Sequence, residues 1–199
     1  MGHSTNNLAA LIGSRICHDL ISPIGAIANG LELMQMSGTA LTPEVALISE
    51  SVENANARIR FFRVAYGMAS AQQPMGRAEV VSILKAVAHG GRVSFHWGPL
   101  DDMPRTEVRL AFLALQCLET AMPYGGRVTL ARDGDIWVIS GNADKIRQMP
   151  ALWASLDMPG RALQVSAAEV QFALLPVLLA EDGRKISLTL TDQSIMMRF

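Results

Sequence analysis

The sequence predicts an α+β protein that begins with an antiparallel helical hairpin and continues into an α/β sandwich. Two observations support this fold class. Residues 7–36 and 42–66 place apolar side chains at helical spacing, whereas helical and strand-like segments alternate in the second half of the chain. Between them, residues 67–76 contain the Gly, Gln and Pro residues typical of a linker. We therefore expect a helical domain over residues 1–73 and a second domain over residues 74–199.

The composition is that of an ordinary folded protein. Of the 199 residues, 50% are hydrophobic and 18% are charged. The net charge of −1 and the absence of a Lys/Arg cluster argue against nucleic acids and anionic membranes as partners. No apolar run reaches the roughly 18 residues that span a membrane, and no signal-peptide pattern opens the chain. A cytoplasmic protein is the default expectation. Cys17 and Cys117 match no metal-binding or redox spacing.

The first helical segment, residues 7–36, carries one continuous apolar stripe. Its members are Ile12, Ile16, Leu20, Ile27, Leu31 and Met34. Pro23 lies inside the segment and is expected to kink it, because a Pro removes one intrahelical hydrogen bond. Gly38 is suited to the C-terminal stop.

The second helical segment has the clearest periodicity in the chain. Thr42-Pro43-Glu44 supplies an N-cap, a Pro at the first position and an early acid. Its apolar residues alternate steps of three and four, as in the seam of a helix bundle: Val45, Ile48, Val52, Ala55, Ile59, Phe62 and Tyr66. A lone hairpin would leave much of this surface in water. A hairpin from a second copy would complete a four-helix bundle, so burial predicts a homodimer.

The second half of the chain predicts a mixed sheet covered on one face by helices. Helical patterns occupy residues 78–89, 107–122, 147–156 and 167–180. Strand patterns occupy residues 92–97, 127–131, 136–140, 185–190 and 194–198. Asp133-Gly134-Asp135 is a tight-turn sequence between two of these strands.

His18 occupies an unusual position on the first helical segment. At about 100° per residue, it falls about 160–180° from Ile16, Leu20 and Ile27 and therefore faces away from the packed side. A solvent-facing imidazole followed by a carboxylate, with a Pro one turn later, is typical of a histidine that carries a phosphoryl group. The alternative interpretation is a solvated surface histidine.

The local sequence resembles a known signalling motif. The pattern His-Asp-Leu-x-x-Pro-Ile resembles the H-box of sensor histidine kinases. From Leu8 to Phe199 the chain resembles the ChpT-type histidine phosphotransferases of alphaproteobacteria, most specifically in the run SRICHDLISPIGAI of residues 14–27. The resemblance implies a dimeric histidine bundle followed by a degenerate histidine-kinase ATPase domain.

The resemblance also implies a function. His18 would accept a phosphoryl group from the receiver-domain aspartate of a hybrid histidine kinase and pass it to a response regulator of the CtrA type. Such a protein is a phosphocarrier rather than an ATP-dependent kinase. A kinase-derived adaptor, which docks receivers or kinases without carrying phosphate, is the alternative.

The second domain lacks the motifs that an ATP-dependent kinase needs. Gln116 and Thr120 stand where two Asn residues would bind Mg²⁺ and phosphates. Residues 140–144, Ser-Gly-Asn-Ala-Asp, contain one Gly and a misplaced Asp where an adenine-reading Asp-x-Gly-x-Gly belongs. We therefore expect no cofactor and no metal in this chain. The resemblance implies that Mg²⁺ is held by the partner receiver domain.

Individual roles follow for the residues around the H-box. His18 would be the nucleophile, and Asp19 would hold the imidazole tautomer or manage its proton; the alternative for Asp19 is a solvated helix charge. The expected docking surface for receivers consists of Arg15, Ile21, Ser22 and Gly25. The alternative for Ser22 is a plain helix-surface residue, and the alternative for Ile21 is a helix-flank residue half covered by the second helix.

Overall fold

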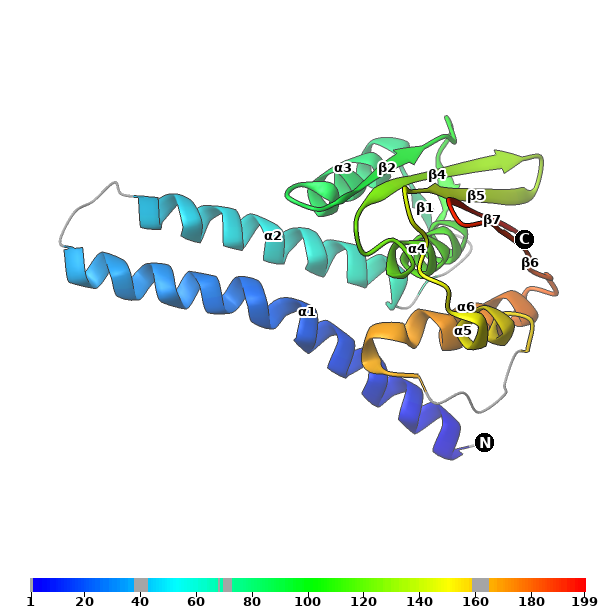
Figure 1. Ribbon diagram of the computed structural model, residues 1–199, viewed down its shortest axis with the longest axis horizontal. Coiled ribbons are helices and arrows are strands. Elements are labelled where there is room, and N and C mark those ends of the chain that lie inside the picture. Colours follow the sequence, from blue (N-terminus) through cyan, green and yellow to red (C-terminus); the bar gives the residue numbers. More distant parts are fainter. Residues whose placement is uncertain (1, 38–42, 68, 70–72, 159–164) are drawn as a thin grey trace.

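The computed structural model describes residues 2–37, 43–67, 69, 73–158 and 165–199. Within the first helix, the side chains of residues 2–11, 14, 17, 18, 21, 35 and 37 lie outside the described part. The described chain combines two long helices with a mixed sheet and its covering helices (Figure 1), which confirms the α+β class.

The two long helices are α1 (Gly2–Ser37) and α2 (Pro43–Ala65), which lie side by side and run in opposite directions (Figure 1). Pro23 lies inside α1, and the helix bends rather than ending there. The helices approach closely at Gly30, where an added Cβ would lie 2.5 Å from Cγ1 of Ile48. The absence of a side chain at Gly30 therefore allows the two helices to lie this close together.

The burial pattern along α2 differs from the predicted seam. Ala55 and Phe62 are buried as expected, but Val52 is 40% exposed and Ile59 is 48% exposed. Buried positions are instead concentrated near the end of α2, at Phe61, Phe62, Val64 and Ala65, where the helix meets the second half of the chain. Sequence periodicity alone did not reveal that this helix packs against the second half of the chain as well as against α1.

The second half contains most of the remaining elements. The helices are α3 (Arg77–Ala88), α4 (Arg105–Thr120), α5 (Pro150–Ser155), the 3₁₀ turn η1 (Ala167–Glu169) and α6 (Val170–Glu181). The strands are β1 (Pro74–Met75), β2 (Val93–Trp97), β3 (Met103–Pro104), β4 (Gly126–Asp133), β5 (Ile136–Asn142), β6 (Ser187–Leu190) and β7 (Ser194–Arg198).

The main sheet has the strand order β2-β4-β5-β7-β6. β2 and β4 are parallel, and the other pairs are antiparallel, so the sheet is mixed as predicted. Alternate residues of β4 and β5, including Leu130, Trp137 and Ile139, are fully buried beneath the helices. β1 lies inside the segment that we interpreted as linker, and it pairs with β3 in a separate antiparallel two-stranded sheet.

Helix α4 is the centre of the molecule. Its residues are almost all buried, because it contacts α2, α6 and the strands β4 and β5. The end of α2 stacks on it through Phe61 and Phe112, whose ring centroids are 4.6 Å apart. The α1–α2 pair is thereby anchored to the sheet domain. Within the described residues, no helix is long and apolar enough to cross a membrane.

Candidate functional site

The segment that resembles the H-box, residues 18–24, lies in the middle of α1 and includes Pro23. We call it the H-box segment. The side chains of His18 and Ile21 lie outside the described residues, so the outward orientation of His18 stays a prediction. Ser22 and Gly25 are exposed, as expected for a docking surface. Arg15 and Asp19 are not, and their surroundings define the site.

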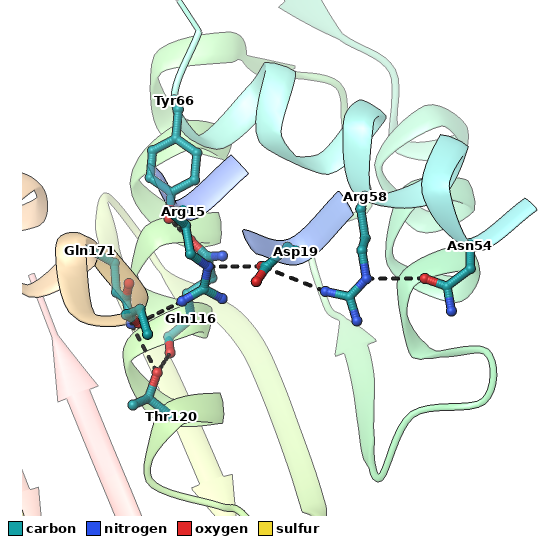
Figure 2. A network of polar contacts seen from close by, with 9 residues as sticks. Arg15, Asp19, Asn54, Arg58, Tyr66, Gln116, Thr120 and Gln171 are labelled. Atoms are coloured by element: carbon teal, nitrogen blue, oxygen red, sulfur yellow. Dashed lines mark hydrogen bonds and ion pairs between the residues drawn. The ribbon is translucent and has the colours of Figure 1, made fainter. Parts of the chain in front are cut away.

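The Asp19 carboxylate is held by guanidinium groups from two helices. Arg15 Nε donates a hydrogen bond of 2.8 Å to Asp19 Oδ2, and Arg58 Nη1 lies 3.6 Å from the same oxygen (Figure 2). The Asp19 side chain is only 9% exposed. The interpretation of Asp19 as a solvated helix charge is therefore wrong, because its neighbours on α1 and α2 enclose it.

Arg15 connects the H-box segment to the second half of the chain. Besides Asp19, its guanidinium donates through Nη1 to the carbonyl oxygen of Ala168 in η1, at 2.5 Å. The Arg15 side chain is 15% exposed. The sequence predicted Arg15 on the docking surface, but the structure places it in an internal contact. Helix periodicity could not show that η1 lies against this face of α1.

Arg58 is the site residue that sequence reasoning missed. On α2 its Nε donates to Asn54 Oδ1 at 3.0 Å, one helical turn earlier, so the guanidinium is fixed between Asn54 and Asp19 (Figure 2). The i, i+4 spacing of Asn54 and Arg58 was a visible signal for the first contact. The second contact depends on how the two helices pack, which no local pattern specifies.

Two cavities flank the Asp19–Arg58 pair. A groove of about 340 Å³ lies between α1 and α2, lined on α1 by Asp19, Ser22, Pro23 and Ala26 and on α2 by Leu47, Glu50, Ser51, Asn54 and Arg58. A cavity of about 200 Å³ lies towards α4, and its lining includes Arg15, Asp19, Arg58, Gln116, Glu119 and Thr120. Burial raises the pKa of Glu119, although the positive charges of Arg15 and Arg58 act in the opposite direction.

The two α4 residues at the expected nucleotide-binding positions are committed to internal hydrogen bonds. Gln116 is buried and its Oε1 accepts from the Tyr66 hydroxyl at 2.8 Å. Thr120 Oγ1 donates to the Gln116 carbonyl at 2.8 Å and accepts from Gln171 Nε2 at 2.9 Å. These bonds join α4 to α6 and to the end of α2 (Figure 2).

The end of β5 is also closely packed. A Cβ added to Gly141 would lie 3.2 Å from Leu118 Cδ2 on α4. Nearby, Trp153 of α5 and Phe172 of α6 are buried and meet edge to face, with centroids 5.1 Å apart. The described residues contain no group of three or more His, Cys, Asp or Glu side chains that could hold a metal ion.

Comparison with known proteins gives consistent results. The family model described as histidine phosphotransferase C-terminal domain matches residues 77–194. The protein phosphotransferase ChpT of Brucella abortus (strain 2308) is 33% identical over 97% of this chain and 95% of its own length. A solved bacterial phosphotransferase matches with a TM-score of 0.81 at 32% identity, over 96% of this chain and 95% of that one. A solved histidine kinase from Burkholderia phymatum matches at 16% identity with a TM-score of 0.41.

Proposed function

This chain belongs to the ChpT-type histidine phosphotransferases, and on that premise we propose that it carries phosphoryl groups between receiver domains on His18. The observation that carries the proposal is an H-box-like segment whose carboxylate, Asp19, is fixed by two guanidinium groups beside an open groove. The donor is the receiver of a hybrid histidine kinase, and the acceptor is a response regulator of the CtrA type. The relay operates in the cytoplasm, as the composition predicts.

The chemistry requires an in-line nucleophile and little else from this chain. An unperturbed imidazole has a pKa of about 6.5 and is mostly neutral near pH 7. One ring nitrogen attacks the phosphorus of the receiver's aspartyl phosphate, the P–O bond breaks, and the aspartate leaves as a carboxylate. The reverse of this step loads the second receiver. Mg²⁺ held by each receiver neutralises the equatorial phosphoryl oxygens.

Asp19 supports the imidazole from the neighbouring position on α1. The other ring nitrogen of His18 keeps its proton during attack. A carboxylate that accepts a hydrogen bond from this N–H group stabilises the positive charge that develops on the ring. Asp19 is suited to this role because its ion pairs keep a negative charge at a defined place in a poorly hydrated site.

Receivers dock at the H-box segment, on the face of α1 formed by the exposed residues Ser22 and Gly25. Ile21 is expected to contribute to the same docking surface. The groove beside Ser22 continues this surface onto α2. Arg15 contributes indirectly, by holding Asp19.

The functional unit is a homodimer built on a four-helix bundle. The α1–α2 pair exposes large apolar side chains, among them Ile24, Leu31, Val52 and Ile59, each at least 40% exposed. A second copy that covers these residues removes them from water, which is the main favourable contribution in obligate helix bundles.

The transfer uses no ATP. Support for this part comes from α4, where Gln116 and Thr120 are occupied by bonds to Tyr66 and Gln171. A nucleotide would have to displace these buried contacts, and each lost hydrogen bond leaves an unsatisfied buried group.

The decisive experiment mixes the purified chain with a phosphorylated receiver domain and measures acid-labile, base-stable label on the chain. We expect label on the wild type and none on His18→Ala. His89→Ala is the matched control, because His89 is exposed at the end of α3 and should leave labelling intact. Label that persists in His18→Ala would contradict the proposal, and partner binding without label would favour the adaptor. Label from ATP and Mg²⁺ alone would indicate a kinase.

A further inference from the structure

We propose that Arg58, on α2, is a positioning residue for phosphoryl transfer and acts through Asp19. The inference rests on the proposed function and adds a residue that the H-box motif does not contain. Its basis is the chain of contacts Asn54–Arg58–Asp19–Arg15, which crosses from one long helix to the other at the H-box segment (Figure 2).

Arg58 has a fixed geometry although it is partly exposed. Its side chain is 39% exposed, yet Nε donates to Asn54 at 3.0 Å while Nη1 lies 3.6 Å from Asp19. An arginine that uses two of its nitrogens in this way is orientated by its planar fork. Nearby Arg60 makes a different contact, with Nη2 at 3.4 Å from the Ser82 hydroxyl on α3.

Asp19 is paired with a second cation, Arg58. The Asp19 side chain is nine-tenths buried, and a buried carboxylate is costly unless it is paired. Arg15 supplies one partner, but the Arg15 guanidinium is shared with the Ala168 carbonyl and is therefore tied to η1. Arg58 approaches the same oxygen, Oδ2, from α2. The two cations together restrain the carboxylate beside the backbone position of His18.

The location of the pair argues for a role in the reaction as well as in the fold. Asp19 and Arg58 line both the groove next to Ser22 and the inner cavity next to Glu119. The pair thus forms part of the wall between a surface that a receiver can reach and the interior of the molecule. Partly exposed ion pairs contribute little to stability, so loss of Arg58 should leave the fold intact while releasing Asp19.

The test compares Arg58→Gln, Arg58→Lys and the control Arg60→Gln in single-turnover transfer from a phosphorylated receiver at varied concentration. We expect Arg58→Gln to lower the maximal rate by about ten- to a hundredfold, the range seen when a group that orients a functional residue is removed. The receiver concentration for half-maximal rate should stay unchanged. Arg58→Lys should recover part of the loss, because it restores the charge but not the planar fork that also binds Asn54. Arg60→Gln should match the wild type.

A double-mutant cycle identifies the route of the effect. If Arg58 acts through Asp19, the loss in Asp19→Asn combined with Arg58→Gln equals that of Asp19→Asn alone. Additive losses, a wild-type rate in Arg58→Gln, or a change confined to the half-maximal concentration would each overturn the inference. Circular dichroism checks that each variant is folded. If Arg58→Gln is unfolded, the test uses Arg58→Lys instead. A folded Arg58→Lys that transfers phosphate no faster than Asp19→Asn would then overturn the inference. Absence of label on wild-type His18 would refute the proposed function itself, which separates the two failures.

Discussion

At the scale of single residues, one buried carboxylate organises the sheet domain. Glu107 of α4 accepts hydrogen bonds from Trp137 Nε1 at 2.8 Å and from Arg132 Nη1 at 3.3 Å, and it pairs with Arg184 beyond α6. Burial alone would raise the pKa of Glu107, but the bonds from Arg184 and Trp137 and the charges of Arg184 and Arg132 outweigh it, so the pKa is lowered.

The Glu107 cluster yields a prediction on stability. Because the folded pKa lies below the ordinary value of 4.5, the ionised group stabilises the fold above that pH, and the contribution is lost as the pH falls through the folded pKa. Glu107→Gln should lower the free energy of unfolding at pH 7 by about 2–3 kcal/mol. Urea unfolding at pH 7 and pH 3 should show the difference from the wild type narrowing in acid.

The control for this prediction is Asp135→Asn. Asp135 contacts the same Arg132 at 3.4 Å, but its side chain is fully exposed, so its removal should leave the urea midpoint unchanged. A Glu107→Gln difference that stays constant between the two pH values would refute the assignment of the lowered pKa.

The residues of the site differ in how far sequence could predict them. The H-box segment could be predicted because its motif consists of residues close together in the sequence. Ser22 and Gly25 are exposed, as helix geometry predicted. Arg58 and the internal role of Arg15 were not visible, since each depends on a contact with another element. Periodicity describes which face of a helix is apolar, and it does not identify the side chains that meet across two helices.

At the scale of elements, replacing Gly by Ala at two positions of α1 is expected to change the melting temperature in opposite directions. A Cβ at Gly25 would meet nothing within 4 Å, whereas one at Gly30 would lie 2.5 Å from Ile48 Cγ1 and 3.2 Å from the Glu44 carbonyl. Inside a helix, Ala raises the free energy of unfolding by about 0.5–1 kcal/mol relative to Gly. We expect Gly25→Ala to raise the melting temperature by a few °C, roughly 2–4 °C per kcal/mol for a chain of this size.

Gly30→Ala should instead lower the melting temperature, because the added methyl group forces α1 and α2 apart. Differential scanning calorimetry of both variants provides the measurement. A rise in both variants would show that Ile48 moves aside at no cost and that the close approach of the helices at Gly30 is not tightly constrained.

The accuracy of the predicted elements depended on length and side-chain pattern. The strand pattern over residues 194–198 matches β7, because a short apolar run, residues 195–197, follows the turn sequence Thr191-Asp192-Gln193. The pair β1–β3 was missed, since each strand has two residues and one of them is Pro. The helix expected at residues 147–156 is shorter, Pro150–Ser155, because Pro150 is suited to the first helical position and Met149 has extended φ.

At the scale of the whole molecule, the exposed apolar side of the α1–α2 pair predicts self-association. Ile59→Glu places a charge on this surface and should raise the dimer dissociation constant at least about tenfold, the change that 1.4 kcal/mol produces. Size-exclusion chromatography with light scattering at several concentrations measures it. Leu100→Glu is the control, because Leu100 is 79% exposed on a loop between β2 and β3. Wild-type chain that elutes as a monomer at all concentrations would rule out the dimer.

The exposed apolar side of these helices also affects how the number of active carriers depends on the amount of chain in the cell. If only paired chains are stable carriers, their number rises with the square of total chain at low expression and linearly once pairing saturates. Small changes in synthesis or proteolysis near that threshold would then be amplified in the flow of signal, with no change in any receiver.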